Sequence, residues 1–302
     1  MRHGRRLFVL TFLLPPLALY AVFVISPYLQ AFQISLTNWR GLSPEYEYVG
    51  PENFSRLLQD HYVWNALKNN AIILVALPVL TIVLALFFAS MLTIGGRSGK
   101  AGVRGVRGAA FYRVVYFFPQ VLSVAIIGVL WKEVYAPRSG ILNGFLRTIG
   151  LDGLAKPWLG VPDFAFWCVL AVMVWSNVGF YVVLFNAAMQ SIPREIYEAA
   201  MLDGAERGET LRKITVPLLW DTIQVAWVYL AILAIDGFAI VQIITLGGPG
   251  NSSDVIGLRL YDTAMGEYKF GYASAIGVAM FFLTLSVAVV ALRLTRRDRI
   301  EL

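Results

Sequence analysis

Long uncharged stretches alternate with short charged ones along this chain. Six stretches hold few or no Asp, Glu, Lys or Arg residues, and the first runs from Leu7 to Trp39. A helix needs roughly 20 apolar residues to cross a bilayer core about 30 Å thick, so each stretch can cross once. The pattern predicts an all-α membrane protein with one transmembrane domain over residues 1–302 and six spans at about 7–31, 69–94, 112–134, 164–190, 219–245 and 270–293.

The first stretch could also be a secretory signal peptide, because Arg2, Arg5 and Arg6 precede it. Signal peptides have roughly 7 to 15 apolar residues and a cleavage site made of small residues. This stretch is far longer, and no convincing cleavage site follows it. We therefore expect a permanent first helix.

The composition agrees with a membrane protein. Hydrophobic residues make up 58% of the chain, charged residues only 15%, and the mean hydropathy is +0.66. Soluble domains carry roughly 25% charged residues, so a large soluble helical protein is disfavoured. With one Cys and two His residues, the chain cannot form an internal disulfide framework, and a Cys/His metal site is not expected.

The distribution of basic residues predicts the orientation. The segments on the same side as the two termini hold 16 of the 25 Lys and Arg residues, and the opposite segments hold 9. Positive charge is enriched on the cytoplasmic side of membrane proteins, so both termini are expected in the cytoplasm.

One cytoplasmic loop, from Arg97 to Arg113, is basic and rich in glycine, which leaves a nucleic-acid or lipid-headgroup site open. We interpret it as the loop that sets the topology, with no nucleic acid as partner. Its resemblance to a phosphate-binding loop fails at Ile94, where glycine is required, and at Ala101, where Ser or Thr would hold Mg²⁺. No ATP site is expected in this chain.

The most charged segment, residues 191–217, joins the fourth and fifth spans and holds five acidic and four basic residues. Pro193 suits the start of a helix, and Gly204 suits its end. Glu209 and Lys213 are spaced for an ion pair on a second helix, which Pro217 is expected to end. The predicted helix-Gly-helix element carries small and large apolar residues that could contact a partner: Ala199, Ala200, Ala205, Ile196, Tyr197, Met201 and Leu202.

This segment resembles the EAA loop of the membrane subunits of ATP-binding-cassette importers. The resemblance rests on a long, fixed spacing of Glu198, Ala199, Ala200, Asp203, Gly204, Ile214 and Pro217. Three further stretches resemble the carbohydrate-importer branch of the family: residues 48–54, 190–193 and 245–250. The chain departs from that branch at Val216, where Leu is commoner, and at Phe238-Ala239, where Phe-Asp is common.

The resemblance implies that residues 193–204 form a coupling helix seated in a cytoplasmic ATPase. Glu198 would anchor the loop by hydrogen bonds, Ala199 and Ala200 would pack closely, and Gly204 would separate two helices. It further implies alternating access in the inner membrane of a bacterial or archaeal cell, driven by two ABC ATPase subunits that bind ATP and Mg²⁺. An extracytoplasmic binding protein would deliver the sugar. Because the chain has one such loop and no internal repeat, a second permease subunit, expected to be a different chain, is required.

Polar residues within the spans are candidates for contacting the solute. A carboxylate at the centre of a membrane helix costs about 2.5 to 3.5 kcal/mol, so Asp236 should face the bundle interior or a wet cavity. An ion pair between Asp236 and the second permease would explain a carboxylate at this position equally well. Sugar hydroxyls leaving water need replacement hydrogen bonds. Aromatic, amide and carboxylate groups on the fourth and fifth spans can supply them, namely Trp175, Asn177, Tyr181, Asn186, Gln224, Tyr229, Asp236 and Gln242.

The sequence is compatible with three alternatives. The cargo could be glycerol phosphate or another polyol. An ion-coupled secondary transporter would ordinarily have paired repeats or several ionisable groups inside the membrane, whereas this chain offers Asp236 and no repeat. A membrane-embedded transferase would need an acid/base constellation, but His3 and His61 fall on opposite sides of the membrane in this topology. We therefore expect a transport subunit that is not itself an enzyme and binds no cofactor.

Overall fold

The computed structural model describes residues 2–43, 45–93 and 109–294, and this part of the chain is helical without a strand. The chain divides into two compact units. Unit 1 comprises Met1–Trp64 and Arg259–Leu285, and unit 2 comprises Asn65–Leu258 and Ser286–Leu302.

Unit 1 opens with a continuous helix in three parts. It then contains a short helix and the hairpin that leads into the last long helix. The elements are α1 (Arg2–Tyr20), the π-helix η1 (Ala21–Ile25), α2 (Ser26–Ser35), α3 (Glu52–Gln59), the π-helix η4 (Asp262–Gly266) and the first part of α15 (Phe270–Leu294).

The end of α2 is held tightly against the start of α15. The Gly271 N–H donates a 2.9 Å hydrogen bond to the Trp39 carbonyl, and a side chain at position 271 would collide with the Thr37 carbonyl. Asn53 of α3 is buried and donates through Nδ2 to the carbonyls of Ser35 and Thr37, both at 2.8 Å. These bonds satisfy backbone groups that the end of α2 leaves free.

Unit 2 contains most of the remaining helices, and two of them continue into unit 1. In chain order they are α4 (His61–Thr93), α5 (Ala109–Val121), α6 (Val124–Val134), α7 (Ile141–Thr148), the 3₁₀-helix η2 (Asp152–Leu154), α8 (Pro162–Gln190), α9 (Arg194–Leu202), α10 (Arg207–Thr210), the π-helix η3 (Leu211–Thr215), α11 (Val216–Leu218), α12 (Trp220–Asp236), α13 (Phe238–Ile244) and α14 (Ile256–Tyr261).

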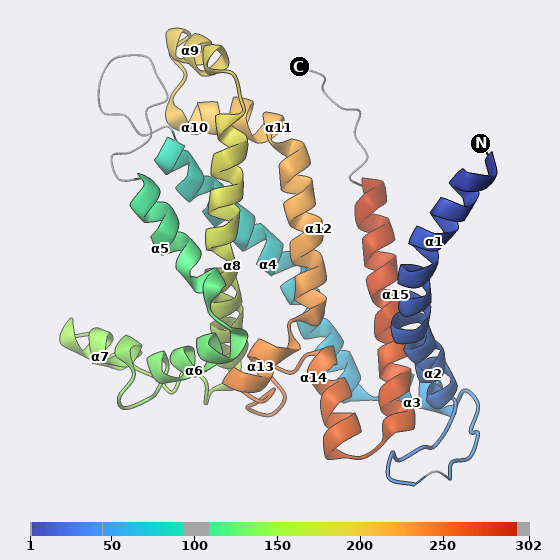
Figure 1. The fold of residues 1–302 in the computed structure, drawn as a ribbon. Coiled ribbons are helices and arrows are strands. Elements are labelled where there is room, and N and C mark those ends of the chain that lie inside the picture. Colours follow the sequence, from blue (N-terminus) through green and yellow to red (C-terminus); the bar gives the residue numbers. More distant parts are fainter. Residues whose placement is uncertain (1, 44, 94–108, 295–302) are drawn as a thin grey trace. The chain divides into compact units, whose positions relative to one another are not determined.

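Helix α8 forms the centre of unit 2. Its residues Val172, Val182 and Phe185 are completely buried. Helix α5 lies along it (Figure 1), and a side chain at Gly179 would collide with the Tyr116 carbonyl, so glycine permits this close approach. Helix α9 lies beyond one end of α8, whereas α6, α7 and α13 gather at the other end (Figure 1).

Four of the described helices are long and apolar enough to cross a membrane. They correspond to the predicted spans 1, 2, 4 and 6, and run over Thr11–Ser35, His61–Leu92, Pro162–Gln190 and Phe270–Val289. Two bent helix pairs bring the number to six if each pair counts as one span.

The predicted third and fifth spans are not single straight helices. At 112–134 the chain turns by 108° between Val121 and Val124, and the Ser123 hydroxyl accepts a hydrogen bond from the Ile126 N–H at the start of α6. At 219–245 the helix ends at Asp236, and Phe238–Ile244 forms the separate helix α13. A further bend of 76° separates Leu218 from α12. Uncharged runs reveal length and apolarity, but they carry no information about these changes of direction.

Candidate coupling loop and membrane cavity

The loop at 191–217 folds as two helices separated at Gly204, as its sequence predicts. Helix α9 starts directly after Pro193. Gly204 has φ +80°, and the Ala205 N–H donates a 3.0 Å hydrogen bond to the Ala200 carbonyl. This pattern ends a helix with one left-handed residue, the conformation that glycine adopts without strain.

The second half of the loop is one continuous helical segment made of α10, η3 and α11. The expected ion pair between Lys213 and Glu209 is present on its exposed face. Pro217 lies within the final turn rather than after it, and the helix ends at Leu218. The sharp bend before α12 follows one residue later.

Buried side chains fasten the two halves of the loop together. Tyr197 is 3% exposed, and its hydroxyl lies 3.4 Å from the Thr215 hydroxyl oxygen. Thr215 is fully buried and also donates to the Thr210 carbonyl at 3.3 Å. Burial raises the pKa of the Tyr197 hydroxyl, so this group stays neutral. The loop is therefore a packed element rather than a loose connection.

Because of this packing, some of the apolar residues that were expected to face a partner are buried, and others are exposed. Tyr197 and Ala200 point into their own chain, and Ile196 is half-buried, whereas Leu202 is 87% exposed at the end of α9. The side chain of Met201 lies outside the described part of the structure. The remaining predicted loop residues divide between exposed positions (Ala199, Asp203, Gly204 and Pro217) and half-buried ones (Glu198, Ala205 and Ile214).

A second candidate site is a cavity of about 270 Å³ within unit 2. It lies where the α5–α6 turn and the α12–α13 break face α8, with Leu77 of α4 in its wall. Its polar lining residues are Gln120, Ser176, Asn177, Tyr229 and Asp236. The two helix interruptions that the sequence does not reveal therefore both border this cavity.

Three of the eight predicted solute-contact residues meet at this cavity: Asn177, Tyr229 and Asp236. Gln120 and Ser176 join them, although neither was predicted from the sequence. Gln120 could have been noticed as a polar residue directly after Pro119 in an uncharged run.

The other five predicted residues lie outside the lining of this cavity. The Trp175 ring packs edge-on against Trp131 at 5.2 Å. Tyr181 is 1% exposed within the core, and Asn186 is buried and accepts a 2.7 Å hydrogen bond from Gln190. Gln224 and Gln242 are half-buried on α12 and α13.

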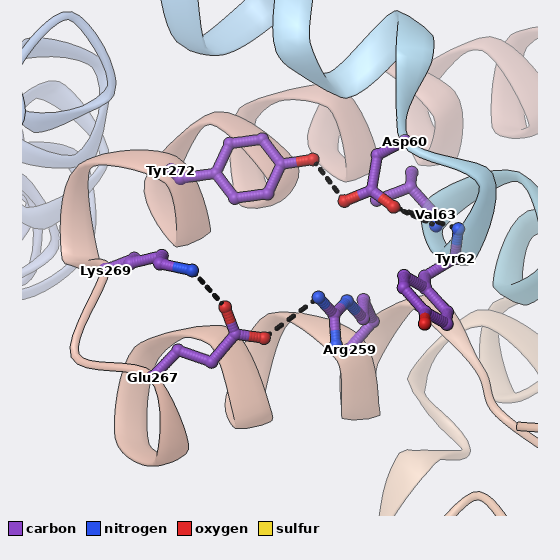
Figure 2. Close-up of polar contacts among 7 residues, drawn as sticks. All are labelled: Asp60, Tyr62, Val63, Arg259, Glu267, Lys269 and Tyr272. Atoms are coloured by element: carbon purple, nitrogen blue, oxygen red, sulfur yellow. Dashed lines mark hydrogen bonds and ion pairs between the residues drawn. The ribbon is translucent and has the colours of Figure 1, made fainter.

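Unit 1 carries a polar cluster, which Figure 2 shows. Glu267 accepts from Arg259 at 2.9 Å and from Lys269 at 2.6 Å, and Tyr272 donates to Asp60 at 2.8 Å. The hydrogen bond from Lys269 is the main cause that lowers the pKa of Glu267.

Two opposing effects act on the pKa of the Asp60 carboxyl group. Burial acts to raise the pKa of Asp60. The hydrogen bonds from Tyr272 and from the N–H groups of Tyr62 and Val63 outweigh it, so the pKa lies below the ordinary value. Through these bonds, Asp60 fastens the start of α4 to the start of α15.

Comparison with known proteins gives consistent matches over nearly the whole chain. Residues 59–299 match the family model described as "Binding-protein-dependent transport system inner membrane component". The chain is 44% identical to the diacetylchitobiose uptake system permease protein of Streptomyces coelicolor, over 98% of this chain and 84% of that protein. It is 31% identical to the multiple sugar-binding transport system permease protein of Streptococcus mutans, over 95% of this chain and 94% of that protein.

The fold also matches a solved structure. A chain of a bacterial alginate ABC transporter, solved in complex with an alginate pentasaccharide-bound periplasmic protein, superposes with a TM-score of 0.82. The match covers 97% of this chain and 96% of that chain at 22% sequence identity, so it concerns the fold alone.

Proposed function

Because this chain belongs to the family of inner membrane components of binding-protein-dependent transport systems, we propose that it forms half of the pathway through which an ATP-driven importer moves a sugar or short oligosaccharide into the cell. The chain is a multi-pass membrane subunit of a transport system. Its partner supplies ATP hydrolysis, and the chain itself provides the membrane path and the attachment point.

The loop at 191–217 is the proposed attachment point for the ATPase. The observation that carries this assignment is the division of its apolar side chains, with Tyr197 buried against Thr215 and Leu202 exposed. An exposed leucine at the end of a rigid helix suits a hydrophobic groove in a partner. Movement of that partner would then be transmitted to α8 and α12, between which the loop lies.

The cavity in unit 2 is the proposed contact region for cargo. Its carboxylate, amides and hydroxyls can replace the water that sugar hydroxyls lose, and Tyr229 adds an aromatic face. Sugars are the cargo in the names of two similar permeases. Diacetylchitobiose is the first compound to test, because the permease named for it shares 44% identity with this chain.

The proposed assembly contains a second, different permease, two ABC ATPase subunits that bind ATP and Mg²⁺, and an extracytoplasmic binding protein. The excess of basic residues on the side of the termini supports an orientation with both termini in the cytoplasm. Part of that excess, from Arg97 to Arg107 and from Arg296 to Arg299, lies outside the described residues. In this orientation the loop at 191–217 faces the ATPase subunits.

Replacing Leu202 by Ser tests the attachment. We expect Leu202→Ser to reduce both the ATPase recovered with the purified chain and sugar uptake by about tenfold, because a fully buried Leu contributes roughly 1.5–3 kcal/mol at an interface. Leu246→Ser is the matched control, since Leu246 is 72% exposed in the loop that follows α13, outside the segment at 191–217. Normal ATPase recovery with Leu202→Ser would contradict the proposed attachment.

A further inference from the structure

The break between α12 and α13 lies directly beside a buried asparagine of α4. Asn70 is 3% exposed, and its Nδ2 donates to the Ala234 carbonyl at 3.1 Å. Ala234 belongs to the last turn of α12, where carbonyl groups lack partners within the helix. The hydrogen bond therefore satisfies a backbone group that the break sets free.

The same asparagine also binds the start of another helix. Its Oδ1 accepts a 2.7 Å hydrogen bond from the N–H of Ile256, the first residue of α14. N–H groups in the first turn of a helix also lack partners within the helix. An amide side chain carries a donor and an acceptor together, so Asn70 can satisfy the end of α12 and the start of α14 at once.

The neighbouring asparagines bind the loop between those helices. Asn69 is 6% exposed and donates to the carbonyls of Ser252 and Asp254 at 3.0 and 2.8 Å, and Asn65 donates to the Asn251 carbonyl at 2.6 Å. These bonds hold only the loop, whereas Asn70 holds the helix break and the start of α14.

The position of the break decides what lines the cavity. Asp236 and Gly237, which follow Ala234 closely, both line it, as does Leu77, two turns after Asn70 on α4. A Cβ at position 237 would lie 2.7 Å from the Met173 Cε, so the break also packs tightly against α8. The Asn70 bond is thus the polar link between the α4 wall of the cavity and the broken helix.

We propose that Asn70 is a positioning residue: it fixes the end of α12 so that Asp236 and the start of α13 face the cavity, and it ties this position to the start of α14. The role of the cavity in transport rests on the proposed function. The position that Asn70 gives to the end of α12 does not depend on the cargo.

Thiol labelling measures this position directly. In membrane vesicles containing the chain with its partners, and in a Cys168→Ala background, Ala239→Cys places a reporter beyond the break and Ser176→Cys places one on α8. Both residues line the cavity. The rate of reaction with a small polar maleimide is measured for each reporter, alone and combined with Asn70→Leu or Asn70→Ala.

We expect the Asn70 variants to change the labelling rate of the Ala239 reporter by about fivefold or more and to leave the Ser176 reporter within about twofold. Asn69→Leu is the matched control, because it removes two hydrogen bonds of a buried asparagine on the same helix and leaves the bond to Ala234 intact. It should leave both reporters within about twofold.

An unchanged Ala239 reporter would overturn the inference, and so would an equal change at both reporters or an equal effect of Asn69→Leu. Failure of both Asn70 variants to accumulate while Asn69→Leu accumulates would also overturn it, since Asn70 would then serve folding. Uptake of diacetylchitobiose is measured separately. If the unsubstituted chain takes up no sugar but the reporter shifts, the proposed function fails and this inference stands.

Discussion

At the scale of single residues, Asp236 is the strongest candidate for contacting cargo. We expect Asp236→Asn to raise the apparent KM for sugar uptake by about tenfold, because a hydrogen bond to a charged group contributes roughly 1.5–3 kcal/mol. ATPase recovery should stay unchanged, since the loop at 191–217 lies at the other end of α12. The measurement is uptake kinetics with labelled disaccharide in vesicles.

Asp221→Asn provides the matched control for this measurement. Asp221 is exposed in the first turn of the same helix and lies outside the cavity lining. An Asp236→Asn variant with the uptake kinetics of the unsubstituted protein would remove Asp236 from the cargo path.

The polar cluster of unit 1 predicts a dependence of stability on pH. The folded-state pKa values of Asp60 and Glu267 are lowered, so both carboxylates stabilise the fold at neutral pH. This contribution diminishes once the pH falls below about 4, the ordinary carboxyl value, and is lost below the lowered folded values. Acidification should therefore weaken unit 1 through this cluster.

Tyr272→Phe removes the hydrogen bond to Asp60 and isolates that contribution. We expect a loss of about 1 kcal/mol at pH 7, allowing for the partial exposure of Asp60, and a smaller loss below about pH 4. Thermal unfolding in detergent across this pH range measures it, with Tyr268→Phe, an exposed position, as control. A loss that is independent of pH would mean that Tyr272 acts through packing alone.

At the scale of elements, Gly204 sets the angle between the two helices of the loop. Proline fixes φ near −65°, which is incompatible with the observed +80°. We expect Gly204→Pro to lower uptake at least about tenfold while the protein still inserts into the membrane, and to uncouple ATP hydrolysis from transport. Alanine in the left-handed conformation costs about 1–2 kcal/mol, so Gly204→Ala should have an intermediate effect.

Gly208→Ala is the control for both substitutions, because Gly208 lies within α10 and an added methyl group there would meet open space. It should transport within about twofold of the unsubstituted chain. Membrane content and the ratio of ATP hydrolysed to sugar transported are measured for all three variants. Normal coupling in Gly204→Pro would show that the angle at this residue does not matter.

The sequence predicts these elements unevenly, for physical reasons. Proline and glycine predict the helix boundaries in the loop at 191–217 well. Proline has a fixed φ that suits the start of a helix, and glycine adopts the positive φ that ends one. Gly237 does not predict the break between α12 and α13 in this way. Its need for a missing side chain comes from packing against Met173, which is far away in the sequence. The sequence does not predict the turn between α5 and α6 either, because the residues before and after it are equally apolar. The cavity between these breaks was therefore predicted only in part.

At the scale of the whole molecule, the topology can be tested with two introduced thiols. Leu202→Cys and Tyr268→Cys place them at exposed positions, one in the loop at 191–217 and one in the hairpin before α15. With both termini in the cytoplasm, an impermeant maleimide added to intact cells should label only the Tyr268 position. After the cells are broken and the ATPase subunits are removed from the membrane, both positions should react. Labelling of the Leu202 position in intact cells would reverse the proposed orientation.

The exposed face of α12 argues for a second permease. Val225, Tyr229, Ile232 and Asp236 follow one another at helical spacing, and all four are exposed. A carboxylate facing lipid would cost about 2.5 to 3.5 kcal/mol, so water or another chain should cover this face. We expect Val225→Cys to form a cross-link with a different permease chain that purifies with this one.

Phe12→Cys should form no such cross-link, although Phe12 is 66% exposed, because α1 presents apolar residues that lipid can cover without a polar cost. Cross-linked products are identified by mass spectrometry after purification from membranes. A cross-link to a second copy of this chain would make the assembly symmetric. An active chain that purifies alone, with the Val225 position open to lipid reagents, would contradict the half-pathway proposal, because no second chain would then cover this face of α12.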